Sequence, residues 1–387
     1  MNKILFITHD TSRTGAPILL LNFIKWLHQV KQITPLILVG RSDELDEEFS
    51  KIGKVFYAYQ PKNSIGKNIF YKIYTRIFNS TTGKNLYYNF LKRRLKKLNI
   101  DIIYSNTICN GYMMEFLSFL NVQQVCHVHE GGSVIEMWGE DNLKMVAKNV
   151  CIYIACSKFV KNVLINKYKI PKEKIELVYE SIPKEFVNKY DSNIINENIE
   201  RYSNKKFSLG GSGGIGHRKG TDLIIPLVKS ILKVTPNFSF TWVGGKINST
   251  EFKELNEQIL NTGLDKIIKI IAAVENPVDY YMQFDLFILL SREDPFPLVC
   301  LENAILGKSI LCFDTAGGIP ELLEECKENI LPFLDIHKMA SRILYLMNNP
   351  IENYKIGQNL QANILKNYTS DICFPMMYDI TQRFSKS

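Results

Sequence analysis

A glycine-rich loop with two cations is the segment of this chain best suited to binding phosphate. The loop GGSGGIGHRKG spans residues 210–220 and joins an apolar, strand-like run to a helix expected to start near Thr221. Glycines let backbone N–H groups approach an anion, and a helix N-terminus adds favourable dipole charge. Arg218 and Lys219 add two positive charges at the same point, which suits a diphosphate. A mobile solvated loop is the alternative.

The same loop also matches a dinucleotide-binding pattern. Gly211, Gly213 and Gly216 satisfy GxGxxG, but that pattern also requires an acidic residue at the end of the next strand to hold a ribose. The next strand-like run ends in WVGGK at residues 242–246, which contains no acid. An NAD-dependent oxidoreductase is therefore the more remote interpretation.

A second segment, SREDPFPLVCLEN at residues 291–303, carries two carboxylates after an apolar strand. We expect Asp294 to cap a helix whose first turn holds Pro295 and Pro297, since that turn needs no amide donors there. Glu302 would then lie about 12 Å along the helix, and the two carboxylates could hold opposite ends of an extended ligand. That spacing disfavours a glycosidase acid–base pair. Simple capping and a solvated helix position are the alternatives.

Two further candidates follow strand-like runs in the first half of the chain. His129 and Glu130 lie in HVHEGG, and Gly15 and Ala16 lie in the turn after the first run. A lone histidine after a strand is more often a structural hydrogen bonder, and a lone glycine is often a turn device. Both segments stay candidates because open α/β sheets bind ligands beyond the carboxyl ends of their strands.

The elements that position these residues alternate along the chain. Apolar, strand-length runs such as KILFITH and DLFILLS are separated by amphipathic helical stretches, the pattern of a parallel sheet covered by helices. The pattern stops in an Asn-rich stretch at residues 191–206 and then restarts. We therefore predict an α/β protein of two Rossmann-like domains with parallel sheets facing across a cleft. Their expected extents are 1–190 and 206–369, with a tail of about 370–387 returning to the first domain.

Composition excludes several classes of protein. Hydrophobic residues at 46% and charged residues at 22% are typical of a folded globular chain and exclude a disordered or collagen-like one. No apolar run approaches the roughly 18 residues of a membrane span, and MNKILFITHD predicts a strand and not a leader, so we expect a cytoplasmic protein. The eight cysteines form no CxxC pair and have no histidine at zinc spacing, so no metal site is expected.

Charge is distributed unevenly, because residues 51–100 hold twelve Lys or Arg and no Asp or Glu. These cations are interleaved with aromatic residues, a composition typical of membrane-surface elements. The residues that we expect to contact anionic lipid are Lys92, Arg93, Arg94, Lys96 and Lys97. A solvated helix face is the alternative. Nucleic acid is disfavoured because no recognition motif accompanies the charge.

The motifs of the second half carry a family resemblance. LSREDPFPLVCLENAILGKSILCFDTAGGIPELL, residues 290–323, resembles the donor-binding region of glycosyltransferase family 4, also called group 1 glycosyltransferases. The family pattern is a Glu, seven residues and a second Glu, followed by a glycine-rich segment ending in Glu. This chain has Asp294 at the first position and then keeps Glu302, Gly317, Gly318 and Glu321. The resemblance is firm over most of residues 207–325 and looser over the first domain, and it implies the GT-B fold.

The resemblance implies roles for individual residues. Lys219 is similar to the family lysine that binds the donor diphosphate, and Arg218 is expected to replace the usual arginine, whose position is Gly214. Glu302 resembles the glutamate that holds the nucleotide ribose, and Asp294 would face the transferred sugar with a shorter reach. His129 resembles a histidine of the sugar pocket, with Glu130 on the acceptor side. The remaining donor-binding candidates are Gly15, Ala16, Phe296, Pro297, Leu298, Gly317 and Gly318.

The activity that the resemblance implies is hexosyl transfer with retention of configuration. The donor would be a UDP- or GDP-linked sugar, the acceptor a saccharide or lipid-linked saccharide, and the pathway surface polysaccharide biosynthesis. Arg218, Lys219 and helix N-termini could neutralise the leaving diphosphate without metal or cofactor, and the sequence contains no Asp-x-Asp motif. Lipid-linked acceptors imply attachment to the inner membrane face. A catalytically degenerate nucleotide-sugar-binding protein is the alternative.

Overall fold

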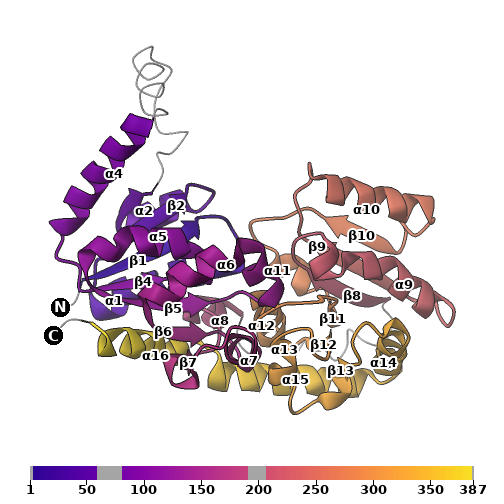
Figure 1. Cartoon of the computed structure of the whole chain (residues 1–387). Coiled ribbons are helices and arrows are strands. Elements are labelled where there is room, and N and C mark those ends of the chain that lie inside the picture. The colour runs from indigo at the N-terminus through magenta and orange to yellow at the C-terminus, as the bar shows by residue number, and fades with distance from the viewer. Residues whose placement is uncertain (1–2, 59–80, 191–205, 386–387) are drawn as a thin grey trace. The chain divides into compact units, whose positions relative to one another are not determined.

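The computed structural model describes residues 3–58, 81–190 and 206–385. The chain divides into two compact units, each built on its own parallel sheet with helices packed on it (Figure 1). The first unit comprises Met1–Cys156, Leu164–Val178 and Phe374–Ser387, and the second comprises Ser157–Val163 and Tyr179–Cys373.

The first unit carries a seven-stranded sheet in the order β3-β2-β1-β4-β5-β6-β7. Neighbouring strands are parallel, and most of their residues are buried, as strands covered on both faces must be. The strands are β1 (Ile4–Asp10), β2 (Leu36–Arg41), β3 (Lys54–Tyr57), β4 (Ile102–Ser105), β5 (Gln123–Val128), β6 (Val150–Ala155) and β7 (Ile175–Leu177). The strand order reverses between β1 and β4, so the loops after these two strands lie beside each other at the ligand-binding edge.

Helices cover this first sheet. They are α1 (Gly15–Lys31), α2 (Asp46–Ile52), α4 (Thr81–Lys96), α5 (Gly111–Leu117) and α6 (Gly132–Asn149). The C-terminal helix α16 (Ser370–Arg383) contributes Phe374, whose ring centroid lies 5.4 Å from that of Phe23 in α1. This aromatic contact joins the last helix of the chain to the core of the first unit.

The second unit carries a six-stranded parallel sheet in the order β10-β9-β8-β11-β12-β13. Its strands are β8 (Phe207–Ser212), β9 (Phe238–Val243), β10 (Ile268–Ile271), β11 (Leu286–Leu289), β12 (Ser309–Phe313) and β13 (Ile330–Leu331). The order reverses between β8 and β11, which brings the glycine-rich loop after β8 beside the loop that follows β11.

The helices of the second unit bury their apolar faces against this sheet. They are α8 (Lys184–Tyr190), α9 (Ile224–Leu232), α10 (Thr250–Asn261), α11 (Val278–Tyr281), α12 (Leu298–Ile305), α13 (Ile319–Leu322), α14 (Ile336–Asn348) and α15 (Pro350–Asn367), while α7 (Lys158–Asn166) begins here and ends in the first unit. Phe240 and Trp242 of β9 lie in the same buried cluster as Ile231 of α9 and Ile343 of α14. The core therefore anchors the strands whose ends carry the candidate residues.

The predicted α/β class with two parallel-sheet, Rossmann-like halves is confirmed. The predicted linker stretch at 191–205 lies outside the described residues, as do the aromatic and basic residues of 59–80. Among the described residues, every helix is too short or too polar to cross a membrane.

Candidate functional site

The glycine-rich loop leaves β8 at Ser212 and forms a short 3-10 turn at His217–Lys219. The expected helix at Thr221 begins with a second 3-10 turn and becomes α-helical only at Ile224. Gly220 ends the first turn with φ 71°, and a Cβ there would lie 1.9 Å from the carbonyl oxygen of Leu290. Only glycine fits this approach, and it holds the loop against the end of β11.

Lys219 and Asp294 form the central ion pair of this edge. The Nζ of Lys219 lies 2.5 Å from Oδ2 of Asp294, and the two side chains are 19% and 7% exposed. The same Oδ2 accepts a hydrogen bond from the hydroxyl of Ser291 at 3.0 Å. The carboxylate therefore holds the lysine ammonium beside the glycine-rich loop, and the lysine side chain stays partly exposed.

The expectation that Asp294 caps a helix is wrong. Helix α12 starts at Leu298 with Pro297 as its N-cap, so Pro295 lies before the helix and the assumed helical spacing from Asp294 to Glu302 does not exist. Asp294 instead pairs with Gly317 in a parallel bridge, donating its N–H to the carbonyl of Ala316 at 2.7 Å. Its carboxylate is paired with Lys219, which lies 75 positions earlier in the chain, and makes no capping hydrogen bond to the helix.

Gly317 and Gly318 belong to this bridge. A Cβ on Gly317 would lie 1.8 Å from the carbonyl oxygen of Asp294, and Gly317 has a φ of 147° that favours glycine. Gly318 donates its N–H to the same carbonyl at 3.2 Å. The two glycines therefore hold the Asp294 backbone in place.

The segment from Phe296 to Leu298 contributes backbone to the site and side chains to the core. Phe296 is 1% exposed, and its ring lies 5.1 Å from that of Tyr179 and 5.6 Å from that of Tyr368. Pro297 is buried and Leu298 is half-buried at the start of α12. Pro297 has no N–H, so the donors that this segment can offer an anion are the backbone N–H groups of Phe296 and Leu298.

Glu302 lies on α12, partly buried, and is the most perturbed carboxyl of this edge. Burial raises the pKa of its carboxyl from 4.5 to about 7. Burial, and to a lesser extent the charge of Glu302, raises the pKa of Tyr281, whose hydroxyl lies 2.7 Å from that of Ser212 at the end of β8. A carboxyl that ionises near neutrality can accept hydrogen bonds from ligand hydroxyls.

A second ion pair that the sequence did not predict joins the same two loops. Both guanidinium NH groups of Arg292 donate to the carboxylate of Asp222 at 2.7 Å, and Arg292 also donates to the carbonyl of His217. Arg218 donates to the carbonyl of Glu293 at 2.8 Å and is otherwise exposed, whereas Gly214 is exposed on the loop. These pairs join residues 70 or more positions apart, so no spacing in the sequence indicates them.

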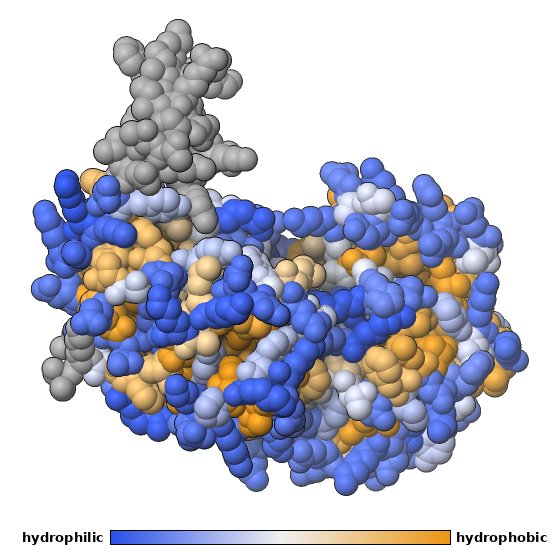
Figure 2. Space-filling view, in the orientation of Figure 1, coloured by the Kyte–Doolittle hydropathy of each residue, from blue (hydrophilic) through white to orange (hydrophobic). Residues whose placement is uncertain are grey.

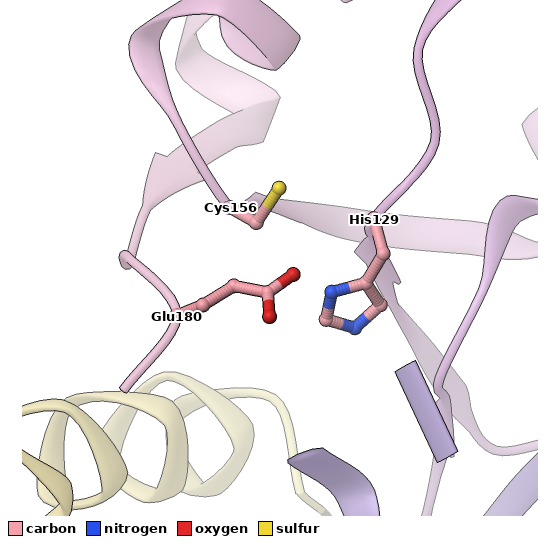
Figure 3. Close-up of side chains that lie close together, drawn as sticks. All are labelled: His129, Cys156 and Glu180. Atoms are coloured by element: carbon pink, nitrogen blue, oxygen red, sulfur yellow. The ribbon is translucent and has the colours of Figure 1, made fainter. Parts of the chain in front are cut away.

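In the first unit, His129 follows β5 and is half-buried. Its ring centroid lies 4.0 Å from that of His127, and a ring nitrogen lies within 4.8 Å of the Cys156 sulfur; both side chains are labelled in Figure 3. Burial holds the pKa of His127 well below its ordinary value, and the Nδ1 of His127 lies 2.7 Å from the hydroxyl of Tyr104.

Glu130 does not extend into solvent. It is 8% exposed, and its carboxylate accepts hydrogen bonds from the hydroxyl of Thr107 and from the backbone N–H groups of Ile108 and His129. The structure places Glu130 between the loops after β4 and β5, and its role on the acceptor side stays a prediction.

Gly15 and Ala16 form the start of α1, at the switch point of the first sheet. Gly15 is exposed, and the carbonyl of Ala16 accepts a hydrogen bond from the Nδ2 of buried Asn106 at 2.8 Å. Because Asn106 directly precedes Thr107, this turn, the loop after β4 and the His129 loop form one connected network in the first unit.

The basic residues at the end of α4 contact aromatic rings. The ammonium of Lys92 lies 5.4 Å from the ring centroids of Phe116 and Phe119, and the guanidinium of Arg94 lies 5.5 Å from that of Phe90, which is 55% exposed. The other three cations that the sequence singles out, Arg93, Lys96 and Lys97, are exposed. Hydrophilic and apolar residues lie next to one another around α4 in Figure 2.

Known proteins resemble this chain over most of its length. A family model described as Glycosyltransferase Family 4 matches residues 19–186, and one described as Glycosyl transferases group 1 matches residues 194–363. The capsular polysaccharide biosynthesis glycosyltransferase CapH of Staphylococcus aureus is 23% identical over 312 residues, 78% of this chain and 78% of CapH. The lipopolysaccharide core biosynthesis mannosyltransferase LpsB of Rhizobium meliloti is 28% identical over 170 residues, 42% of this chain and 48% of LpsB.

Solved structures share the fold. HepE of Anabaena, in complex with UDP and glucose, matches with a TM-score of 0.76 and 18% identity, covering 99% of this chain and 100% of that chain. An identity this low shows a common fold, so the ligand of this chain must be inferred from its own residues.

Proposed function

Because this chain belongs to the group 1 glycosyltransferases, also called glycosyltransferase family 4, we propose that it transfers a hexosyl group from a UDP- or GDP-linked sugar to a saccharide acceptor. It has the GT-B fold, with two parallel-sheet, Rossmann-like domains. The observation that carries the proposal is the edge of the second sheet, where Arg218 and Lys219 meet the loop that leads into the first turn of α12.

The leaving group dictates what this edge must do. A nucleoside diphosphate departs as an anion, so the largest catalytic contribution comes from prearranged positive charge and N–H donors. In the proposal Lys219 and Arg218 neutralise the diphosphate, and the N–H groups of Phe296 and Leu298, on either side of Pro297, hold its oxygens. Glu302 accepts hydrogen bonds from the ribose hydroxyls. These groups supply the charge, so the proposed transfer is metal-independent.

The family resemblance assigns two residues to the transferred sugar, Asp294 and His129. Asp294 lies at the family's sugar-facing position, fixed by Gly317 and Gly318, and His129 would line the sugar pocket. The proposal includes front-side attack by the acceptor within an ion pair, with retention of configuration. Gly15 and Ala16 would lie along the diphosphate through the first turn of α1.

The acceptor follows from the relatives. CapH is a glycosyltransferase of capsular polysaccharide biosynthesis and LpsB a mannosyltransferase of the lipopolysaccharide core, which supports a role in making a polysaccharide. HepE was solved in complex with UDP and with UDP-glucose, which supports a nucleotide-sugar donor.

We extend the proposal to a lipid-linked acceptor and to peripheral attachment at the inner membrane face. The five cations from Lys92 to Lys97 and the exposed Phe90 would contact anionic lipid. Sedimentation with vesicles tests this: binding to anionic and not to neutral vesicles supports it, and equal binding to both contradicts it.

A thermal-shift titration against UDP, GDP, ADP and NAD tests the donor site. A ligand at 100 times its dissociation constant stabilises a protein by about 2.7 kcal/mol, a readily measured shift. Selective stabilisation by UDP or GDP supports the proposal and identifies the base, and a response to NAD alone contradicts it.

One observation favours a second candidate, a degenerate nucleotide-sugar-binding protein. Asp294 replaces the family glutamate and is bound to Lys219. The measurement that separates the candidates is release of UDP from UDP-glucose over time, with and without saccharide acceptors. Stabilisation by UDP without release under any condition favours the binding protein.

A further inference from the structure

We propose that Glu130 is a positioning residue for sugar transfer, which holds the backbone of His129 and does not itself bind acceptor. The inference rests on the proposed function, because it gives His129 a place in the sugar pocket. It concerns the first unit alone and uses only contacts within it.

The hydrogen bonds of Glu130 leave little of its carboxylate for a ligand. Oε1 accepts from the hydroxyl of Thr107, and Oε2 accepts from the N–H of His129 at 3.0 Å and from the N–H of Ile108 at 3.4 Å. The residue is 8% exposed. An ionised carboxylate with several donors makes strong, charge-assisted hydrogen bonds, so this group fixes the geometry of whatever donates to it.

The donors of Glu130 are themselves fixed. The hydroxyl oxygen of Thr107 accepts a hydrogen bond from the N–H of Cys109 at 3.0 Å, so its proton is directed to Glu130. Thr107 and Ile108 follow β4, the strand next to β5 in the sheet. Glu130 therefore ties the loop that carries His129 to the loop after β4 through hydrogen bonds.

The ring of His129 is held from its other side. It lies against the ring of His127, which is anchored by Tyr104 on β4. With the backbone fixed by Glu130 and the ring packed on His127, the imidazole keeps one orientation. A catalytic group held to within a fraction of an ångström loses much of its effect when its support is removed.

The test compares Glu130→Gln and Glu130→Asp with Glu136→Gln, a matched control on α6 whose carboxylate is exposed and paired only to Lys167 at 2.8 Å among the contacts described. We expect Glu130→Gln to lower kcat severalfold, by no more than His129→Ala does, without changing the dissociation constant for UDP, because an amide cannot accept from all three donors. Glu130→Asp should recover part of the loss. Amide hydrogen exchange over residues 127–131 should become faster in Glu130→Gln and stay unchanged in Glu136→Gln.

A double variant decides between positioning and direct binding. If Glu130 acts through His129, then His129→Ala with Glu130→Gln is no slower than His129→Ala alone. Additive losses, or a rise in the KM for acceptor as the main effect of Glu130→Gln, would overturn the inference. Unchanged hydrogen exchange would overturn it too, whatever the activity. A wild-type protein that transfers no sugar would refute the proposed function. Amide hydrogen exchange needs no turnover, so it would still decide whether Glu130 holds the backbone of His129.

Discussion

Two pairs of neighbouring loops, one at the edge of each sheet, are held by different bonds. In the second unit, two ion pairs join the loops after β8 and β11: Lys219 with Asp294, and Arg292 with Asp222. In the first unit, one buried carboxylate, that of Glu130, joins the loops after β4 and β5 through N–H and O–H donors.

This difference indicates different tasks. The cations of the second unit are partly exposed and can exchange a carboxylate for the oxygens of a phosphate, so their edge is suited to binding. The charge of Glu130 is fully occupied inside the protein, so its edge is suited to holding a reactive group still. We expect substitutions in the second unit to change donor affinity and those in the first to change turnover.

The largest effect is expected from Lys219→Ala. It removes a charge-assisted contact to the diphosphate worth roughly 1.5 to 3 kcal/mol, so affinity for UDP should fall by about one to two orders of magnitude. Isothermal titration measures this, with Lys229→Ala, an exposed lysine of α9, as the control.

The variant also leaves the carboxylate of Asp294, 7% exposed, without its cation. The double variant with Asp294→Asn should therefore regain stability but not affinity. Recovery of affinity in the double variant would show that Lys219 acts only by neutralising Asp294.

His129→Ala sharpens the comparison from the other side. The imidazole would contact the transferred sugar, so kcat should fall about tenfold while the dissociation constant for UDP stays the same. Steady-state kinetics and titration together measure the two quantities, and His28→Ala, an exposed histidine of α1, is the control. If His129→Ala instead weakened UDP binding and left kcat unchanged, the assignment of turnover to the first unit and donor affinity to the second would be wrong.

Glu302→Gln should have a smaller effect that depends on pH. Because the pKa of Glu302 is about 7, its carboxyl is ionised at pH 8 and largely protonated at pH 5.5, and only the ionised form accepts strongly from ribose hydroxyls. We expect wild-type UDP affinity to rise severalfold between these pH values and the variant to show no such rise. A parallel rise in both would assign the pH dependence to another group.

Glu302 should affect stability in the opposite direction. Its pKa in the folded state is raised above the ordinary 4.5, so the stability that it contributes is present below pH 4.5 and is lost as the pH rises through 7. Without ligand, Glu302→Gln should therefore melt at a higher temperature than wild type at pH 8 and at nearly the same temperature at pH 4.5.

The smallest effect is expected from Arg292→Met. Its bond to Asp222 is bidentate, but Asp222 is 48% exposed, and exposed pairs contribute only about 0 to 1 kcal/mol. UDP affinity should fall about twofold through loss of order in the loop at His217, which calorimetry can resolve. A loss as large as that of Lys219→Ala would mean that Arg292 itself contacts the diphosphate.

Much of this arrangement follows from local sequence. Strand-length apolar runs that alternate with amphipathic helices have few ways to bury both faces, so the α/β class with two parallel sheets could be predicted. Glycines before a helix predict a loop open to anions, and Gly220 is required there for a reason that the structure makes plain. The positions of Arg218 and Lys219 followed from the same loop.

Local rules failed where distant groups competed. An aspartate followed by two prolines has good capping chemistry, yet Asp294 pairs with Lys219 because a buried carboxylate gains more from a cation than from an amide. The role of Glu130 depends on Thr107, 23 positions earlier in the chain, lying beside it in the loop after the neighbouring strand β4.

The sequence by itself determined the elements, the family and the residues that could bind a nucleoside diphosphate, because periodicity and glycine spacing act over short stretches of chain. Only the tertiary structure decided which charged side chains form ion pairs between loops, as Lys219 and Asp294 do, and which are buried and hydrogen-bonded, as Glu130 is. Those pairings depend on strand order. The ends of β8 and β11 become neighbours in the second sheet, and those of β4 and β5 in the first, only after each sheet has formed.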